Sequence, residues 1–177
     1  FCDPFCGSGT IAIEAALMAK NRAPGLDRSF DAQKWKTVPG ESWMDAAEEA
    51  MDQEYDGDYD IWGGDIDPRA IAIARSNAEK AGVEDLVRFE VADATSFSRS
   101  SDYGQLVTNP PYGERLLEQA GQLYRAFVRA AAALPEKWRV YILSSHPEFE
   151  ACYGSLAAKK RKLYNGMIKC DLFMYYR

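Results

Sequence analysis

The sequence has few residues suited to metal binding or nucleophilic catalysis. It contains one histidine, His146, and four cysteines, Cys2, Cys6, Cys152 and Cys170, with no Cys-x-x-Cys pair among them. No metal site is therefore predicted, and a disulfide framework is not expected in a 177-residue chain of this pattern. Reduced thiols predict a cytoplasmic protein. Cys6 could act as a nucleophile, but no obvious base lies near it in the sequence, so this role is not favoured.

Long hydrophobic runs are also missing. No apolar stretch approaches the ~18 residues that a membrane-spanning helix needs, and the chain shows no signal peptide. With 47% hydrophobic residues, the composition fits one α/β domain rather than a disordered chain. Because the chain begins Phe1-Cys2-Asp3, inside an expected strand and without methionine, we expect residues 1–177 to be one domain of a longer protein.

The excess of positive charge that nucleic-acid-binding proteins commonly carry is absent, since the formal net charge is −6. The acidity is local, however. Residues 41–60 contain nine acidic residues and no Lys or Arg, and the remainder has 21 basic against 18 acidic residues, a balance of +3. We therefore do not expect segment 41–60 to face phosphate groups, whereas the charge excludes nothing for the rest of the chain.

Helix and strand signals alternate along the chain. Helices are expected at residues 10–20, 42–52, 68–81, 117–134 and 147–153, the third starting at the Asp67-Pro68 cap and stopping at Gly82. Strands are expected before the first helix and at residues 59–64, 86–91, 105–108 and 139–144, with a long connection at 21–43. Segment 162–175 contains Asn165-Gly166, the dipeptide preferred in type I′ hairpin turns. This alternation predicts an open, mostly parallel sheet with helices on both faces and a C-terminal antiparallel hairpin.

A glycine-rich loop leads into the first helix with the sequence Asp3-Pro4-Phe5-Cys6-Gly7-Ser8-Gly9-Thr10. Glycines let the backbone approach a ligand, and a helix N-terminus offers free N–H groups. The loop lacks the lysine of a Walker phosphate loop. Gly7, Gly9 and Ala12 match the pattern of NAD-binding loops, whereas for S-adenosylmethionine Asp3 could face the cationic methionine end. The loop alone leaves NAD, S-adenosylmethionine and a turn without ligand open.

Carboxylates follow the next two strands. Asp65, with Ile66 after it, stands where a carboxylate can accept hydrogen bonds from both hydroxyls of a ribose, whereas Asp67 already serves as a helix cap. Asp93 and Ala94 follow the third strand, where the carboxylate could accept from an adenine amino group. For Asp93 alone, an ordinary loop acid is the simpler interpretation. Ligands of such sheets bind at the carboxyl ends of the strands, so we expect a single site there.

The segment Asn109-Pro110-Pro111-Tyr112 follows the fourth strand and discriminates between the cofactors. Its two prolines remove two N–H donors and stiffen the loop, which keeps its carbonyls available as acceptors. The Asn109 side-chain oxygen and the Pro110 carbonyl can accept both N–H bonds of a planar amino group, and Tyr112 can stack on the attached ring. Two acceptors draw the amino nitrogen toward tetrahedral geometry, which suits attack on a sulfonium methyl group. These four residues are therefore the expected catalytic residues, and S-adenosylmethionine is the expected cofactor.

These motifs, in this order, resemble the Rossmann-like class I methyltransferases that act on amino groups. Residues 3–10 and 13–16, Arg22-Ala23-Pro24-Gly25, and residues 109–115 and 159–166 make the chain similar to the THUMP-associated bacterial RNA guanine-N2 methyltransferases. The resemblance covers most of the chain. It implies a seven-stranded class I methyltransferase fold and methyl transfer to the N2 of a guanosine in RNA, with 23S ribosomal RNA as the first candidate substrate. It also implies an RNA-binding THUMP domain N-terminal to these residues.

The resemblance implies a set of cofactor-binding residues as well. Asp3, Cys6 and Gly7 would line the methionine end, Asp65 the ribose and Asp93 the adenine. The whole expected set comprises residues 3–10, 65–66, 93–94 and 109. No metal and no membrane belong to this interpretation.

Two groups of charged residues are candidates for contacting the RNA. Glu114 and Arg115 flank Asn109-Pro110-Pro111-Tyr112, which we call the clamp, and there a carboxylate can accept from guanine N1–H and an arginine can reach O6. Lys159, Lys160 and Arg161 begin the densest basic run and are expected to hold phosphates. An edge strand guarded by lysines explains that run equally well.

Other functions share parts of this pattern. Guanine-N2 methylation of tRNA, adenine-N6 methylation of DNA and glutamine methylation of proteins all use a similar clamp, and the family-like segments alone separate them. A NAD-dependent oxidoreductase would use the glycine-rich loop but would leave residues 109–112 without a task. A non-catalytic RNA-binding module is disfavoured by the net charge of −6.

Overall fold

A mixed seven-stranded sheet forms the centre of the computed structural model, which describes residues 1–111 and 117–176, with the backbone alone for residues 117–121. Its strands are β1 (Cys2–Asp3), β2 (Ile61–Asp65), β3 (Val87–Val91), β4 (Tyr103–Thr108), β5 (Lys137–Ser144), β6 (Lys159–Asn165) and β7 (Ile168–Tyr175). Their order in the sheet is β3-β2-β1-β4-β5-β7-β6, and β1 to β5 are parallel. Strand β7 runs antiparallel to both β5 and β6. The predicted Rossmann-like sheet with its C-terminal hairpin is confirmed.

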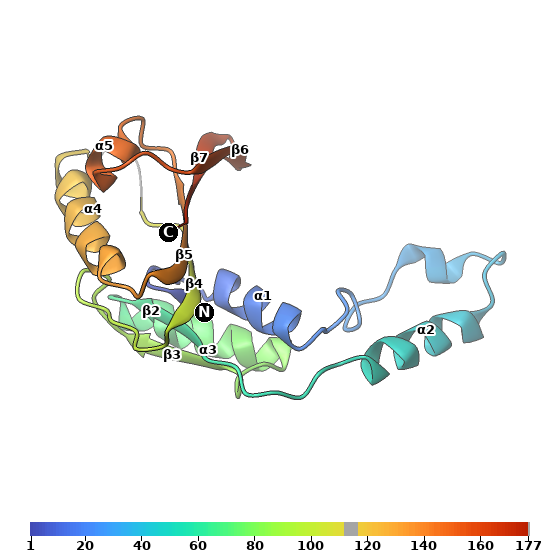
Figure 1. Ribbon diagram of the computed structural model, residues 1–177. Coiled ribbons are helices and arrows are strands. Elements are labelled where there is room, and N and C mark those ends of the chain that lie inside the picture. Colours follow the sequence, from blue (N-terminus) through green and yellow to red (C-terminus); the bar gives the residue numbers. More distant parts are fainter. Residues whose placement is uncertain (112–116, 177) are drawn as a thin grey trace.

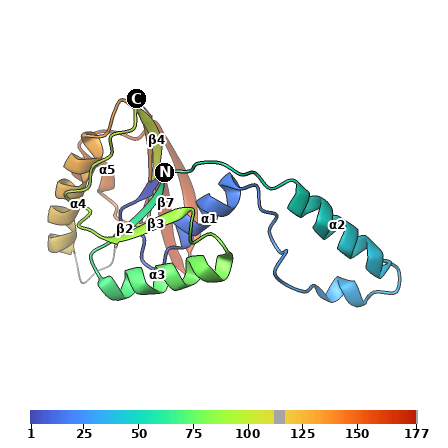
Figure 2. The same ribbon diagram turned by 90° about the horizontal axis from the view of Figure 1, so that it is seen from below.

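Helices cover both faces of the sheet, as Figures 1 and 2 show. Helices α1 (Thr10–Ala19) and α3 (Pro68–Ala81) lie on one face, and α4 (Leu117–Ala132) and α5 (Phe149–Tyr153) lie on the other. Each face has its own buried cluster, one around Ile13, Ile71 and Phe89, the other around Leu106 and Phe127. None of the described helices is long and apolar enough to cross a lipid bilayer.

The caps of α3 are as predicted. Asp67 accepts a hydrogen bond from the Arg69 N–H at 2.8 Å, and Pro68 occupies the first turn. Gly82 ends the helix with a φ of 64°, a conformation that favours glycine. The local sequence therefore determines where this helix begins and ends.

Several strand starts lie earlier than predicted. Strands β4, β5 and β6 begin at Tyr103, Lys137 and Lys159, two to three residues before the expected positions. These first residues are exposed, so an apolar pattern marks the buried part of each strand and misses its beginning.

The hairpin turn between β6 and β7 also differs from the prediction. Asn165 pairs with Ile168, so the turn residues are Gly166 and Met167, and a positive φ at the first alone is typical of type II′ rather than the predicted type I′.

The long connection after α1 is an arm that projects from the sheet and its helices (Figures 1 and 2). It contains a 3₁₀ helix, η1 (Asp31–Lys34), which was not predicted, and α2 (Gly40–Asp52), which carries much of the acidic segment. No residue of α2 is buried, and Met44 is 66% exposed. Phe30 stacks on Trp43 with ring centroids 6.0 Å apart, so the two limbs of the arm contact each other.

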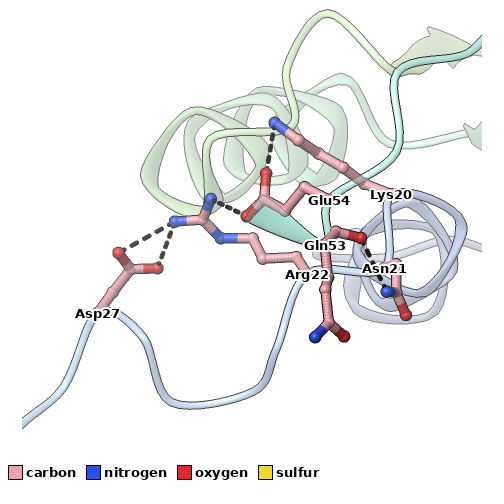
Figure 3. A network of polar contacts seen from close by, with 6 residues as sticks. All are labelled: Lys20, Asn21, Arg22, Asp27, Gln53 and Glu54. Atoms are coloured by element: carbon pink, nitrogen blue, oxygen red, sulfur yellow. Dashed lines mark hydrogen bonds and ion pairs between the residues drawn. The ribbon is translucent and has the colours of Figure 1, made fainter. Parts of the chain in front are cut away.

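A network of charged and polar groups closes the base of the arm, as Figure 3 shows. Glu54 lies at its centre and pairs with both Lys20 and Arg22, each at 3.0 Å. Arg22 also binds both oxygens of Asp27, at 3.0 and 3.1 Å, and the Asn21 side chain donates to the Gln53 carbonyl at 2.9 Å. The Glu54 side chain is only 14% exposed, so these pairs are less screened by solvent than ordinary surface ion pairs. The two ends of the arm are therefore tied directly to each other.

Glu54→Gln is expected to loosen the arm without unfolding the domain. The substitution removes the charge that holds two cations, so amide hydrogen exchange in residues 21–54 should accelerate by roughly ten-fold, while the melting temperature changes little. Lys34→Ala is the matched control, because the Lys34–Asp31 pair is 80% and 92% exposed and should contribute almost nothing. Equal exchange rates in Glu54→Gln and the parent chain would show that the network does not hold the arm.

Candidate active site

The carboxyl ends of β1 to β4 meet at one edge of the sheet and surround a cavity of about 400 Å³. Its lining comprises Pro4, Phe5, Gly7, Asp65, Ile66, Asp93, Ala94, Asn109, Pro111 and Leu123. The structure thus brings together residues from the glycine-rich loop, from both expected carboxylate positions and from the Asn-Pro-Pro segment. Asp3, Cys6, Ser8, Gly9, Thr10 and Pro110, also expected at the site, do not line the cavity.

A larger hollow of about 940 Å³ lies elsewhere, beside α1. Its wall includes Phe1, Ile61, Tyr103 and Lys137, which stand at the amino ends of four strands. Parallel α/β sheets bind ligands at the opposite ends. The smaller cavity, where the carboxylates and Asn109 converge, is therefore the better candidate for a site of chemistry.

Gly7 and Gly9 have different tasks in the loop. Both have positive φ values, 52° and 86°. A side chain at Gly9 would place its Cβ 2.8 Å from the Phe89 ring and 3.0 Å from the Ala74 Cβ, so this glycine permits α1 to pack against α3 and β3. A Cβ at Gly7 would meet no atom within 4 Å, and Gly7 lines the cavity. Gly7 therefore leaves its backbone open to a ligand.

Asp65 fastens the loop to the end of β2. One carboxylate oxygen, Oδ2, accepts from the Gly7 N–H at 3.0 Å, and Oδ1 accepts from the Asp67 N–H at 2.9 Å. A bond from the Cys6 N–H to the Gly64 carbonyl, at 2.9 Å, supports the same junction. Each carboxylate oxygen has a second lone pair, so Asp65 can accept further hydrogen bonds from a ligand in the cavity.

Asp93 follows β3, which is separated from β1 and its glycine-rich loop by β2, and it lines the cavity. Its Oδ1 accepts from the Thr95 N–H at 2.8 Å and from the Thr95 hydroxyl at 2.7 Å. These hydrogen bonds, the backbone one foremost, lower the pKa of Asp93. The exposed carboxylate is therefore ionised at neutral pH and can accept a hydrogen bond from a ligand amino group.

Asp3 lies beneath the loop instead of on the cavity wall. It is 1% exposed, and its Oδ1 accepts from the Thr108 hydroxyl at 2.6 Å and from the Phe5 N–H at 3.2 Å. Its Oδ2 is buried and has no hydrogen-bond partner within the described ranges. Burial raises the pKa of Asp3 to about 7, although the bonds from Thr108 and Phe5 favour the ionised form. Asp3 is thus poised between two charge states near neutral pH.

Cys6 is not activated as a nucleophile. It is 6% exposed, and burial raises the pKa of its thiol to about 12, with the carboxylates of Asp3 and Asp65 acting in the same direction. The thiolate, which is the reactive form, is therefore almost absent at neutral pH. Nor do the described residues contain a group of three or more His, Cys, Asp or Glu side chains placed to hold a metal ion.

The Asn109-Pro110-Pro111 turn presents an acceptor that has no donor. Asn109 Oδ1 is buried, and the described part of the chain provides it with no hydrogen-bond partner. The Pro111 carbonyl is already occupied, since it accepts from the Tyr124 hydroxyl at 2.9 Å. Because a buried acceptor without a donor costs free energy, Asn109 is suited to receive an N–H from a bound molecule. Tyr112, Glu114 and Arg115, which the sequence also proposes for the site, lie outside the described residues.

The basic residues Lys159, Lys160 and Arg161 lie far from this cavity. They occupy the edge strand β6, which is separated from β4 by β5 and β7. All three are exposed, and Lys160 pairs with Glu150 at 2.7 Å. The structure therefore does not bring this basic run together with the clamp.

Two residues of the site could not be found from the sequence. Leu123 reaches the cavity from α4, and Thr108 supplies the hydroxyl that binds Asp3. Neither belongs to a recognisable motif. Leu123 lies in an ordinary amphipathic helix, and Thr108 is one of several polar residues in its strand.

The lining as a whole suits a nucleoside that carries a positive charge. Asp65 and Asp93 place two carboxylates on the wall, and Asp3 adds a third beneath it. Phe5, Ile66 and Leu123 offer apolar contact to a planar ring. Gly7, whose backbone is open, and Asn109, whose side-chain oxygen is buried and has no partner among the described residues, both line this cavity.

Comparison with known proteins gives a consistent picture. Residues 1–173 match the family model described as RMKL-like, methyltransferase domain. The chain is 45% identical, over 99% of its length, to YpsC of Bacillus subtilis strain 168, which is named by prediction as an RNA methyltransferase. It is 39% identical, over 98% of its length, to ribosomal RNA large subunit methyltransferase K/L of Shewanella baltica strain OS185. It spans 46% of the first relative and 25% of the second, so it corresponds to part of each.

Solved structures agree with this match. SMU.472, named by prediction as a methyltransferase and crystallised in complex with SAH (S-adenosylhomocysteine), superposes with a TM-score of 0.94 at 42% identity, covering 99% of this chain and 47% of that one. A protein of Listeria monocytogenes, named by prediction as an N6-adenine-specific DNA methylase, superposes with a TM-score of 0.91 at 47% identity, covering 99% of this chain and 46% of that one.

Asp3 should make the stability of the fold depend on pH. Its folded-state pKa of about 7 lies above the usual 3.8, so its contribution is fully present below about pH 4 and is lost as the pH rises through 7. Relative to Asp3→Asn, which cannot ionise, the free energy of unfolding of the parent chain should fall between pH 4 and 7, by up to about 4 kcal/mol. Urea denaturation at a series of pH values measures this, and parallel pH profiles for the two proteins would contradict it.

The two loop glycines should respond differently to alanine. Gly9→Ala combines a left-handed backbone with a clash against Phe89, and is expected to lower the free energy of unfolding by about 2–4 kcal/mol. Gly7→Ala, the matched control, also has a positive φ, but its Cβ would enter open space, so it should lower the free energy of unfolding by about 1–2 kcal/mol. Thermal and chemical denaturation provide the comparison. A larger loss for Gly7→Ala would refute the packing role of Gly9.

Proposed function

This chain belongs to the family of RMKL-like methyltransferase domains, and on that premise we propose that it transfers a methyl group from S-adenosylmethionine to the exocyclic N2 of a guanosine in RNA. The observation that carries the proposal is Asn109, which lines the cavity and whose buried side-chain oxygen has no donor among the described residues. An exocyclic amino group supplies the missing N–H. The names of YpsC and of methyltransferase K/L support RNA, and ribosomal RNA in particular, as the substrate.

The cavity offers each part of S-adenosylmethionine a partner. Asp65 would accept from the ribose hydroxyls and Asp93 from the adenine amino group, with Ile66 and Ala94 beside the ring. The loop backbone at Gly7 would approach the methionine end, and the carboxylate of Asp3 beneath it would favour the positive charge there. SAH bound to SMU.472, whose structure is so similar, supports this assignment.

The bound cofactor supplies an electrophilic methyl group on a sulfonium. The contribution of the chain is to orient and polarise the amino group that attacks it. Asn109 Oδ1 and the Pro110 carbonyl would each accept one N–H. This draws the nitrogen toward tetrahedral geometry and takes its lone pair out of conjugation with the purine ring. Charge that develops on the amino hydrogens in the transition state strengthens both hydrogen bonds, so these acceptors lower the barrier without a strong general base. Tyr112 would stack on the guanine.

A guanosine stacked in a helix would have to leave the stack to enter this cavity, because an enzyme cannot reach its target atom inside a duplex. Glu114 and Arg115 would then contact the Watson–Crick edge of guanine. Lys159, Lys160 and Arg161, on the exposed strand β6, would bind phosphates at a distance from the target nucleotide. We further propose that most of the affinity for 23S rRNA comes from an N-terminal THUMP domain of a longer polypeptide, and that the reaction takes place in the cytoplasm.

Adenine is the alternative target, since the Listeria relative is named for N6-adenine methylation of DNA. An oxidoreductase that uses NAD is set aside, because the chain belongs to a methyltransferase family and Asn109 would have no task in such an enzyme. Mass spectrometry of nucleosides separates the remaining candidates. RNA from a strain without the full-length protein should lack N2-methylguanosine at one position, and adding the protein with S-adenosylmethionine should restore it. Loss of N6-methyladenine from DNA instead would overturn the proposal.

The clamp and the ribose carboxylate should separate turnover from cofactor affinity. Asn109→Ala removes an acceptor that acts in the transition state, so kcat should fall about 100-fold or more, while the affinity for SAH changes little. Asp65→Ala should raise the Kd for SAH about ten-fold or more, because it removes a ribose acceptor and an anchor of the loop.

Asp67→Ala is the matched control for both variants. This carboxylate lies two residues after Asp65 but caps α3 instead of lining the cavity. Its removal should cost about 1 kcal/mol of stability and leave calorimetric SAH binding and kcat unchanged. Full activity of Asn109→Ala would exclude the clamp mechanism.

A further inference from the structure

The end of β4 and the end of β1 are joined by one buried hydrogen bond. The Thr108 hydroxyl donates to Asp3 Oδ1 at 2.6 Å, and each residue is only 1% exposed. The two strands pair in parallel with Cys2 opposite Leu106, so this bond forms just beyond their backbone ladder. At 2.6 Å the bond has the length of a charge-assisted O–H···O⁻ interaction.

The same carboxylate oxygen also contacts the glycine-rich loop. Asp3 Oδ1 accepts from the N–H of Phe5, which lines the cavity. Thr108 is the residue immediately before Asn109. One buried carboxylate therefore connects the glycine-rich loop to the residue that precedes the Asn109 turn.

The turn that carries Asn109 is held at both ends. On its far side, the Tyr124 hydroxyl donates to the Pro111 carbonyl at 2.9 Å. On its near side, the side-chain bond of Thr108 to Asp3 fixes the last residue of the strand. Between them, Pro110 fixes its own φ and restricts the backbone of Asn109. Because the Asn109 oxygen has no partner of its own in the described structure, its position depends on these neighbours.

The Thr108–Asp3 pair is not the arrangement that stability alone would favour. Burying a carboxylate with one unpartnered oxygen is unfavourable, and an apolar pair of similar size is often as stable or more stable. The surroundings do not compensate the charge of Asp3, because Asp65 faces it as a second carboxylate and the neighbouring Cys6 is uncharged at neutral pH. The arrangement therefore favours geometry at the site over stability of the fold.

We propose that Thr108 is a positioning residue of the methyl transfer, which acts through its hydrogen bond to Asp3 to set the Asn109 carboxamide and to couple it to the cofactor loop. The inference rests on the proposed function and adds a residue to its mechanism. Thr108 does not line the cavity and need not touch either reactant.

Thr108→Val and Thr108→Ser test this role as a pair. The valine variant keeps the shape and loses the donor, so kcat should fall about ten- to a hundred-fold, the range expected for a hydrogen bond to a charged group. The serine variant keeps the hydroxyl and should restore most of the activity. The ionised Asp3 is the form that favours the positive methionine end of the cofactor, so its protonation should produce an acidic limb in the kcat/KM profile. Loss of the Thr108 donor raises the pKa of Asp3 further, and this limb should therefore move to higher pH in the valine variant alone.

Leu106→Val is the matched control on the same strand. Leu106 is fully buried on the same side of β4 but belongs to the core, so this variant should lower the melting temperature and leave the pH profile unchanged. Asp3→Asn is a second variant if Thr108→Val does not fold. It retains an acceptor for Thr108 and should abolish the acidic limb.

A readout without turnover separates this inference from the proposed function. The side-chain amide resonances of Asn109 in a ¹⁵N spectrum, assigned with Asn109→Gln, should shift in Thr108→Val and return in Thr108→Ser. If no RNA is methylated but these resonances respond, the proposed substrate is wrong and the positioning role stands. If Thr108→Val keeps the parent's resonances, kcat and pH profile, or if Leu106→Val changes them equally, Thr108 has no positioning role.

Discussion

Parallel pairing of β3, β2, β1 and β4 is the constraint on which the rest of this structure depends. It places four strand ends side by side, so that side chains from positions 3, 65, 93 and 109 come within reach of one cavity or its floor. The loop after β1 then has to turn sharply into α1 within that crowded edge, which requires glycine at position 9. Asp65 secures the turn by accepting two backbone N–H groups from different elements. The residues that line the cavity are therefore set by the order of these four strand ends.

The three carboxylates at that edge differ because their surroundings differ. Asp93 is exposed and hydrogen-bonded, so its pKa is lowered and its charge is permanent at neutral pH. Asp3 is buried, and its pKa rises to about 7. Asp65 accepts one backbone N–H with each carboxylate oxygen and can still accept further hydrogen bonds from a ligand. In the sequence the three aspartates look equivalent, whereas the fold gives each of them a different environment.

Local signals in the sequence were sufficient for much of the fold. The cap at Asp67, the stop at Gly82 and the alternation of apolar segments predict the elements, because these depend on neighbours within a few residues. The glycine-rich loop and the Asn-Pro-Pro turn likewise predict a site, and residues of both line one cavity. The burial of Asp3, its bond to Thr108 and the approach of Leu123 could not be predicted, since they arise from strand order and helix packing between distant segments. The separation of Lys160 from the clamp has the same origin, because two strands are inserted between β4 and β6.

The network around Glu54 has a consequence for how this domain can change over evolutionary time. Because Lys20, Arg22 and Glu54 join the two ends of the arm to each other, the intervening residues form a closed loop that leaves the sheet and returns at one place. Insertions or deletions inside such a loop alter its closure entropy only slowly with length. The arm is thus a module whose size and surface can diverge between relatives, while the cavity on the other side of the junction keeps its geometry.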